Sequence, residues 1–292
     1  MAKRKRNNKI KLSGTAIAVL IVIAVIFYIA DVIINNESIA LSGDCEFHFI
    51  DVGQGDSALI ISEEGVVVID AGPQDHAEST LEYIQSYTEE IDYLILTHPH
   101  EDHIGGADEI VSSLTVKNVI MSDAYSDTET IERLLDAIEK SGADVIEAKA
   151  GDEYTAGGIE LTILSPVTEF ADFNDYSVVT RVEYGETSAI ITGDVEKNSE
   201  GIMVERYMRS LLRADIYQVS HHGSVTSNSE EFLDAVSPKY AVIQCGEDNS
   251  YGHPHKETVD KLEERGIEYF RTDERGHIVF ITDGKELELK GQ

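Results

Sequence analysis

The chain has 292 residues, of which 42% are hydrophobic and 27% charged, the composition of a globular protein with enough residues for a sizeable core. Its 55 acidic and 23 basic residues give a formal net charge of −32. This charge excludes a broad basic surface for nucleic acid, because phosphate affinity comes mainly from Lys and Arg, so any nucleic-acid contact has to be local.

The N-terminal region predicts a membrane anchor. Residues 1–13 form a tail with six Lys and Arg and no acid, and residues 14–34 form an apolar run whose one charge is Asp31. At ~1.5 Å per residue, a helix of this length crosses a ~30 Å hydrocarbon core. Because basic flanks stay inside, we expect a single-pass protein of the cell membrane with a cytoplasmic N-terminus and an extracytoplasmic domain. A cleaved signal peptide is the alternative, but its apolar region usually has only ~7–15 residues.

After a linker at residues 35–44, strands and helices interleave, which predicts one α/β domain over residues 45–292. Apolar runs and alternation predict strands at 46–52, 57–62, 66–70, 92–96, 116–121, 143–147, 159–164, 178–184, 188–192, 216–219, 240–244, 268–271, 277–281 and 286–289. Helical periodicity predicts helices at 76–87, 107–113, 127–141, 196–212, 230–236 and 256–265. Two sheets with helices covering their outer faces is the arrangement that this order favours.

The cysteines, Cys45 and Cys245, lie far apart in the chain, and no Cys-x-x-Cys or Cys-His spacing occurs, which excludes a structural zinc finger. Two alternatives stand for this pair. One is a single long-range disulfide, if the domain lies outside the cell, and the other is two buried thiols.

The stretch Thr97–Gly106 is the densest cluster of metal-ligand side chains. Directly after the predicted strand at 92–96, it carries His98, His100, Asp102 and His103. Imidazole nitrogens and carboxylate oxygens at the mouth of a strand can converge on a borderline metal such as zinc. Their spacing at i, i+2, i+4 and i+5 disfavours the alternative, a polar loop that is rich in histidine by chance. We therefore predict a metal site here.

Further candidates follow other predicted strands, where functional residues of α/β folds commonly lie. They are the acids Asp70 and Asp194, and the histidine pairs His221/His222 and His253/His255. The histidines in predicted strands and helices are expected to be structural: His48, His76 and His277. Three arginines are candidate phosphate contacts by chemical type alone: Arg181, Arg271 and Arg275.

These motifs resemble a known family. The pattern His98-x-His100-x-Asp102-His103 resembles the signature of the metallo-β-lactamase superfamily, whose fold is a four-layer αββα sandwich. Further motifs are similar to the branch formed by the C-terminal domain of the ComEC/Rec2 DNA-uptake channel and its free-standing relatives. They are Phe49-Ile50-Asp51-Val52-Gly53-Gln54-Gly55-Asp56-Ser57, Ile69-Asp70-Ala71-Gly72, Thr192-Gly193-Asp194, Val219-Ser220-His221-His222-Gly223-Ser224 and Tyr251-Gly252-His253-Pro254-His255. The resemblance spans about residues 45–283.

The resemblance implies a site for two divalent ions, Zn or Mn. His98 and His100 would hold the first ion, Asp102 and His103 the second, and Asp194 would bridge them. His221 matches a later ligand, although the sequence does not separate it from His222, and Asp70 matches an acid that orients the ligands. The superfamily often has another histidine between the motif and the bridging acid, and residues 104–193 contain none. Asn174, Asp175 or a water is expected to take its place.

The function that the resemblance implies is a membrane-anchored hydrolase. A hydroxide held by two metal ions would attack a phosphodiester, either DNA or a smaller ester such as a phosphorylcholine or teichoic-acid ester. Asp70, Asp102 and Asp194 are the expected catalytic acids, and His222, His253, His255 and Asn174 the further candidates for substrate or metal contact. One alternative is a surface-tethered binding module in DNA uptake that turns nothing over. Another is an esterase or lactonase of the same fold.

Overall fold

The computed structural model describes residues 43–124 and 126–291, and their strands form two sheets. The first sheet contains β1 (Cys45–Phe49), β2 (Ala58–Ile61), β3 (Val66–Ile69), β4 (Glu90–Leu96), β5 (Thr115–Met121), β6 (Asp144–Glu147), β14 (Ile278–Thr282) and β15 (Leu287–Leu289), in the order β15-β14-β1-β2-β3-β4-β5-β6. The second contains β7 (Glu153–Ala156), β8 (Ile159–Ser165), β9 (Val179–Tyr184), β10 (Thr187–Ile191), β11 (Ile216–Gln218), β12 (Tyr240–Ile243) and β13 (Glu268–Arg271), in the order β13-β12-β11-β10-β9-β8-β7.

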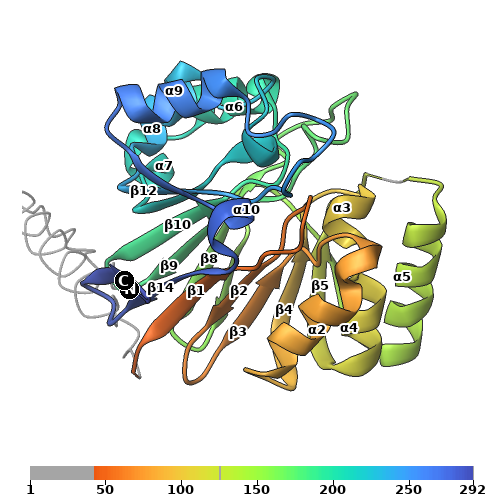
Figure 1. Cartoon of the computed structure of the whole chain (residues 1–292). Helices are drawn as coiled ribbons and strands as arrows, with labels where there is room; N and C mark the ends of the chain where they lie inside the picture. Colours follow the sequence, from red (N-terminus) through yellow and green to blue (C-terminus); the bar gives the residue numbers. More distant parts are fainter. Residues whose placement is uncertain (1–42, 125, 292) are drawn as a thin grey trace, which may run out of the picture. The chain divides into compact units, whose positions relative to one another are not determined.

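Helices cover the outer face of each sheet (Figure 1). The first sheet is covered by η1 (Gln74–His76), α2 (Ala77–Gln85), α3 (Glu101–Ile104), α4 (Ala107–Ser113) and α5 (Glu129–Ser141). The second is covered by α6 (Lys197–Arg206), α7 (Arg209–Leu212), α8 (Glu230–Val236) and α9 (Lys256–Glu264). Two short helical turns, η2 (Ser220–Gly223) and α10 (Thr272–Arg275), lie in connections. The predicted four-layer αββα sandwich is confirmed.

The period of two along the strands explains how one strand serves two layers. In β3, Val67 and Ile69 pack between the sheets, whereas Val68 packs under the outer helices. In β4, Ile95 faces the inner core and Leu94 the outer one. Strands buried on both faces read as continuous apolar runs, as these do in the sequence.

Parallel pairing gathers the functional loops. β3, β4, β5 and β6 pair in parallel in the first sheet, as do β10, β11, β12 and β13 in the second. Because parallel strands end at the same edge of a sheet, the loops after β3, β4, β10 and β11 lie together, where ligands bind in open α/β sheets. The backbone register places Asp70 beside the end of β4, since its N–H donates to the carbonyl of Ile95 at 2.8 Å.

Some elements differ from the predicted ones. The helix predicted over 196–212 is broken into α6 and α7, because Tyr207 leaves the helical region with φ −102° and ψ 147°. Its hydroxyl donates to the carbonyl of Leu164 at 2.8 Å, so the contact with β8 outweighs helix continuation. The strand β7 was not predicted, and it forms a hairpin with β8 around Gly157, whose φ is +57°.

Cys45 and Cys245 are free and buried, so the alternative of two buried thiols holds. They belong to different layers, Cys45 to the core between the sheets and Cys245 to the core under the outer helices of the second sheet. Burial raises the pKa of both thiols, which keeps them protonated and unreactive.

The anchor predicted at residues 14–34 lies outside the described residues. Within residues 43–124 and 126–291, no helix has the length and apolar character needed to cross a bilayer.

Candidate metal centre

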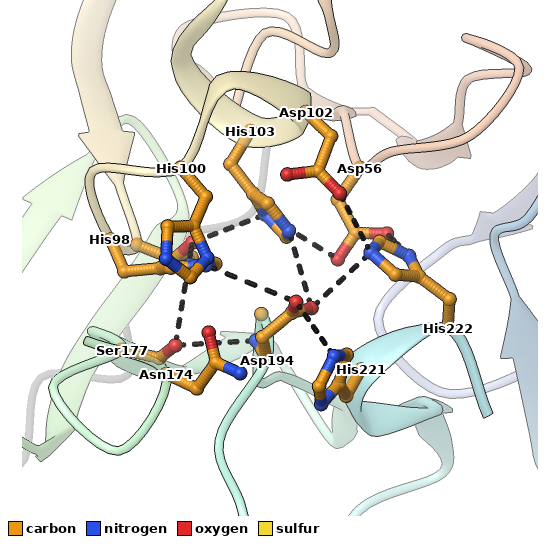
Figure 2. A network of polar contacts seen from close by, with 12 residues as sticks. Asp56, His98, His100, Asp102, His103, Asn174, Ser177, Asp194, His221 and His222 are labelled. Carbon is orange, nitrogen blue, oxygen red and sulfur yellow. Dashed lines mark hydrogen bonds and ion pairs between the residues drawn. The ribbon is translucent and has the colours of Figure 1, made fainter. Parts of the chain in front are cut away.

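The donors of the predicted site come together from several strand ends (Figure 2). His98 follows β4, and His100 is the N-cap of α3, whose single turn carries Asp102 and His103. This helical turn explains the spacing of the motif, because it brings Asp102 and His103 next to His98 and His100. Asp194 follows β10, and His221 and His222 lie in η2 after β11.

The donors form two sets that share Asp194. In the first set, His98 Nε2 lies 2.9 Å from His100 Nδ1 and 3.9 Å from Asp194 Oδ2. In the second set, Asp194 Oδ1 lies 3.2 Å from His103 Nε2 and 3.4 Å from His222 Nε2, which is itself 3.4 Å from Asp102 Oδ2. Two tetrahedral ligands that are each ~2.1 Å from one ion stand roughly 3.4 Å apart. The second set has this spacing. The first set brackets it, because His98 and His100 lie at hydrogen-bond distance and Asp194 stands farther away. Asp194 offers a different oxygen to each set.

Three buried atoms of the second set, His103 Nε2, His222 Nε2 and Asp194 Oδ1, make no hydrogen bond of good geometry among the described residues. Their only partners there are the ion-pair contacts at 3.2–3.4 Å within the set. Buried polar atoms are normally satisfied by hydrogen bonds, so three such atoms at one point need an explanation. A divalent cation supplies it, because both imidazole nitrogens and the carboxylate oxygen would become its ligands. The residues present thus fit a metal ion.

The charges of the site are strongly coupled. Burial alone would lower the pKa of His103, but the carboxylates of Asp194, Asp70 and Asp102 raise it well above its usual value. Burial lowers the pKa of His98, and the neighbouring charge on His103 lowers it further. Without a cation, the carboxylates thus draw protons to the second set, whereas His98 stays neutral. Since a metal binds the deprotonated nitrogen, protons and metal compete for the second set.

Asp70 orients ligands of both sets from the buried end of β3. Its Oδ1 accepts from the backbone N–H of Thr97 at 2.8 Å, and its Oδ2 accepts from the Thr97 hydroxyl at 2.7 Å. The same Oδ2 lies 2.8 Å from His103 Nδ1, and the Thr97 hydroxyl lies 3.1 Å from His98 Nδ1. The Nδ1 atoms of both imidazoles are thus engaged, and their Nε2 atoms are left for the sets. This is the arrangement by which carboxylates orient metal-binding histidines.

Asp56 is a site residue that the sequence analysis does not assign. Its Oδ1 lies 3.3 Å from His222 Nδ1, and its Oδ2 lies 3.8 Å from His103 Nδ1. The preceding Gly55 allows this position, because a Cβ there would stand 2.2 Å from the backbone carbonyl oxygen of Asp102. The available signal was the Gly-Gln-Gly-Asp motif itself, in which an acid follows a turn too tight for any side chain.

His221 and His222 differ in what they face. Both have φ 53°, a left-handed conformation that non-glycine residues rarely adopt and that is concentrated at functional sites. His222 directs Nε2 into the second set, and its Nδ1 lies 3.0 Å from the carbonyl oxygen of Gln244. His221 lies at the edge, with Nε2 3.5 Å from Asp194 Oδ2 and Nδ1 3.2 Å from the Thr226 hydroxyl.

Asn174 and Asp175 also differ in what their side chains contact. Asp175 Oδ1 accepts from the backbone N–H groups of Glu196 and Ser199 at 3.3 and 3.1 Å, so it stabilises the start of α6. Asn174 lies beside the first set (Figure 2), and its buried Oδ1 has no hydrogen-bond partner among the described residues. Of the two, Asn174 is therefore the one whose side-chain oxygen is free to take the position of a further ligand.

A family model described as "Metallo-beta-lactamase superfamily" matches residues 50–247. The chain belongs to this superfamily. It is 32% identical to ComE operon protein 3 of Bacillus subtilis, over 82% of this chain and 33% of that protein. It is also 32% identical to Recombination protein 2 of Haemophilus influenzae, over 73% of this chain and 26% of that protein. The chain thus spans about a third of the length of these curated relatives or less, and the resemblance predicted from its motifs is confirmed.

Solved structures show the same fold. The metallo-beta-lactamase fold protein YhfI from Bacillus subtilis aligns with a TM-score of 0.55 at 16% identity, covering 82% of this chain and all of that one, 100%. A diiron β-hydroxylase from Streptomyces venezuelae, CmlA, aligns with a TM-score of 0.52 at 13% identity, over 79% of this chain and 53% of that one. Since one metallo-beta-lactamase fold carries a hydroxylase, the reaction has to be argued from the site.

Several of the clustered donors line a cavity of about 830 Å³. Its wall includes His100, Asp102, Asn174, Asp194, His221 and His222, together with Gln54, Pro73, Gln74, Asp75, His76, Glu101, Tyr251 and His253. No Lys or Arg belongs to this wall within the described part of the chain. An anionic ligand would therefore find its counter-charge at bound cations rather than at basic side chains.

Of the histidines outside the two donor sets, some line the cavity and others only stabilise the fold. His253 is buried in the cavity wall, and its Nδ1 has no hydrogen-bond partner among the described residues. His255 does not line the cavity and instead accepts from the backbone N–H of Val225 at 3.2 Å. His48 and His277 lie against Tyr83 and away from the donors, as expected of structural histidines. His76 differs from its structural interpretation, because it lines the cavity beside Asp75.

The three candidate arginines do not line the cavity, so their interpretation as phosphate contacts is corrected. Arg181 is buried, and its guanidinium donates to the backbone carbonyl of Leu211 and to Glu183. Arg271 pairs with Asp273, and Arg275 lies 4.8 Å from the ring centre of Phe270. Residue type could not show that each guanidinium already has partners within the fold.

Proposed function

We propose that the protein is a metal-dependent hydrolase of phosphodiesters, either DNA or a smaller phosphoester, that works with two divalent cations, Zn or Mn. The observation that carries this proposal is the position of Asp194, whose two oxygens belong to two separate converging donor sets. When bound at such a pair of sites, two cations supply Lewis acidity to both the attacking and the leaving oxygen of a phosphoester.

The donor sets suggest the ligands. His98, His100 and Asp194 would hold the first cation, and Asp102, His103, Asp194 and His222 the second. His222, rather than the His221 favoured from the sequence, would be the histidine ligand from the loop after β11. Its donor atom and those of Asp102, His103 and Asp194 all lie within 4.8 Å of one another. His221 would then border the substrate. The first set has three protein ligands, which leaves Asn174 or a water to complete it.

The residues around the ligands prepare the site. Asp70 and Asp56 hold the Nδ1 atoms of His103 and His222, so the opposite nitrogens face the cation positions before any cation arrives. Preorganisation of this kind lowers the cost of assembling a metal site. The acidic cavity wall, with Asp75 and Glu101, repels an anionic substrate that is not screened by cations. We infer that substrate binds only to the metal-loaded protein.

The relatives support a role near nucleic acid. Competence protein ComA of Neisseria gonorrhoeae is 29% identical over 79% of this chain and 31% of that protein, and other relatives are named for the ComE operon and for recombination. We propose that this chain acts in DNA uptake and is held at the cell membrane by residues 14–34. Membrane fractionation and protease accessibility of the full chain test the anchor, and recovery in the soluble fraction would reject it.

A surface-tethered binding module is the second candidate. It is favoured by the first donor set, which has one protein ligand fewer than the second. An incomplete first site would leave a protein that holds substrate through one cation without turning it over.

Metal analysis followed by a substrate panel decides between these functions. We expect two Zn or Mn per full-length chain, and hydrolysis of a single-stranded oligonucleotide or a model phosphodiester in preference to a lactone or a β-lactam. His100→Ala and Asp194→Ala should each lower kcat at least about a hundredfold. Equal rates in folded His100→Ala and Asp194→Ala proteins would reject the hydrolase, and one metal per chain with binding but no turnover would support the binding module.

Removal of the metal gives a readout that does not depend on turnover. A ligand present at about a hundred times its Kd stabilises the fold by about 2.7 kcal/mol. A chelator should therefore lower the Tm by roughly 5–10 °C, and added Zn or Mn should restore it. Asp194→Ala should show no such response, because both sets lose a ligand. A Tm of the wild-type chain that ignores both chelator and metal would count against a resident metal.

A further inference from the structure

Two exposed aromatic side chains lie close to the donor sets. Tyr251 lines the cavity and is 64% exposed. Phe173 does not line the cavity, but it is 36% exposed and its ring lies nearly perpendicular to that of the lining residue His100, with ring centres 6.1 Å apart. Large exposed aromatics cost solvation free energy, and beside a cavity they are candidates for a surface that a ligand covers. The proposed hydrolysis of a phosphodiester gives neither of them a role.

Tyr251 is the outer member of a stack that leads to the metal site. Its ring lies on that of His253 with an interplanar angle of 18° and ring centres 5.6 Å apart. His253 in turn lies 5.9 Å from the ring of His222, at an angle of 33°. The backbone of His253 is fixed on both sides by Asn249, which accepts from its N–H at 2.9 Å and donates to its carbonyl at 2.6 Å. The stack is therefore a rigid support, and the outer part of Tyr251 is open.

Phe173 stands at the other donor set. It touches His100 of the first set, whereas Tyr251 reaches the second set through His253 and His222. A phosphodiester has two substituents, one on each side of the phosphorus. An ester whose phosphate lies between the two sets would place one substituent near each aromatic ring.

We propose that Tyr251, supported by His253, stacks against an unpaired nucleobase next to the scissile phosphate, and that Phe173 receives the base on the other side. This inference rests on the proposed phosphodiesterase function and narrows its substrate to single-stranded nucleic acid. Stacking suits this cavity, because an aromatic face holds a base without charge, and the wall offers no Lys or Arg among its described residues to hold the backbone. A duplex conceals its base faces, and a polyol phosphate of the teichoic-acid type has none.

Kinetics on matched substrates test the inference. The full-length, metal-loaded chain is given a single-stranded oligonucleotide and an abasic oligomer with the same sugar-phosphate backbone. Wild type should show a KM for the base-bearing strand at least about fivefold below that for the abasic one, since a stacked base contributes about 1–3 kcal/mol. In Tyr251→Ala this ratio should fall toward one, and in Tyr251→Phe it should be kept within about twofold. Phe173→Ala and Phe173→Tyr form the matching pair on the other side.

Two results would overturn the inference and leave the phosphodiesterase standing. One is equal hydrolysis of both strands by wild type. The other is a base preference that Tyr251→Ala retains. If neither strand is hydrolysed, the proposed function fails, and fluorescence then decides the stacking alone.

The fluorescence measurement uses the absence of tryptophan from the chain. Tyr251→Trp introduces a single reporter at the cavity, and Tyr87→Trp is the control, because Tyr87 is 43% exposed and does not line the cavity. Stacking predicts that the base-bearing strand quenches the reporter in Tyr251→Trp and that the abasic strand does not, with no base-dependent change in Tyr87→Trp. Equal signals from both strands in Tyr251→Trp would reject the stacking surface.

Discussion

Asp70 Oδ2 lies 2.8 Å from His103 Nδ1, and the same carboxylate receives the backbone N–H and the hydroxyl of Thr97. A single buried acid thereby fixes a proposed ligand of the second cation and, through the Thr97 hydroxyl, a proposed ligand of the first. Asp70 has φ 58°, so the chain keeps a left-handed residue there to bring the carboxylate under both imidazoles.

Asp70→Asn should weaken metal binding without unfolding the protein. Asparagine keeps the shape of the side chain and tolerates the left-handed backbone, but it cannot match the hydrogen bonding of a carboxylate to His103. Loss of such an orienting partner typically costs 10–100-fold in metal affinity, and we expect a loss in this range by chelator competition. The control is Asp75→Asn, since Asp75 lines the cavity but bonds to His76. Wild-type metal affinity in Asp70→Asn would contradict this positioning role.

The sequence predicts the fold and the donors of the centre because both are local patterns. The strands β3, β4, β10 and β11 end at Ile69, Leu96, Ile191 and Gln218, and the donors and their orienting acid follow within a few residues. Parallel pairing then brings these ends together. A pattern of strand ends followed by ligand-type side chains therefore predicts which loops form the site.

The choice between neighbours cannot be predicted in this way. His221 and His222 have the same side chain and the same backbone φ, and they differ in their tertiary partners, with Asp56 and the Gln244 carbonyl at Nδ1 of His222. Asp56 lies 166 positions before His222 in the chain, and Gln244 lies 22 positions after it. Asp175 is a similar case, because only the fold shows that it caps α6.

His222→Asn and His221→Asn form a matched pair that tests the ligand assignment. Asparagine tolerates the left-handed φ at both positions, so the backbone effect is the same in both variants. His222→Asn should lose about one metal per chain and at least about a hundredfold in kcat, because the second set loses a nitrogen ligand. His221→Asn should retain both metals. Metal analysis of the purified proteins checks this, and loss of metal in His221→Asn alone would reverse the assignment.

Gln244→Leu should destabilise the domain, because the Gln244 side chain links a connection of the first sheet to the second sheet. Gln244 Nε2 donates to the carbonyls of Ile50 and Ser57 at 3.0 and 2.8 Å, and its Oε1 accepts from Gln218 Nε2 at 3.0 Å. Leucine fills the space but leaves the Ile50 carbonyl and Gln218 Nε2 without this partner, whereas the Ser57 carbonyl keeps the N–H of Ile50, and the change should cost about 2–4 kcal/mol in urea unfolding. Gln85→Leu on α2 is the control for a change of the same type and should stay within about 0.5 kcal/mol. An equally small effect of Gln244→Leu would show that the link between the sheets is dispensable.

His48 should make the domain less stable in mild acid. It is buried on the outer side of β1 with Nδ1 2.8 Å from the Tyr83 hydroxyl. Burial lowers its pKa from 6.5 to about 4, even though Glu46, 3.0 Å from Nε2, favours the protonated form. Since the unfolded chain takes up this proton first, stability is lost as the pH falls from 6.5 toward 4, by up to about 3 kcal/mol. Urea unfolding at pH 7 and pH 5 should therefore differ less in His48→Gln and in His48→Leu, two non-titrating side chains of different shape, than in wild type. If both variants kept the wild-type difference between the two pH values, His48 would not be the residue that carries it.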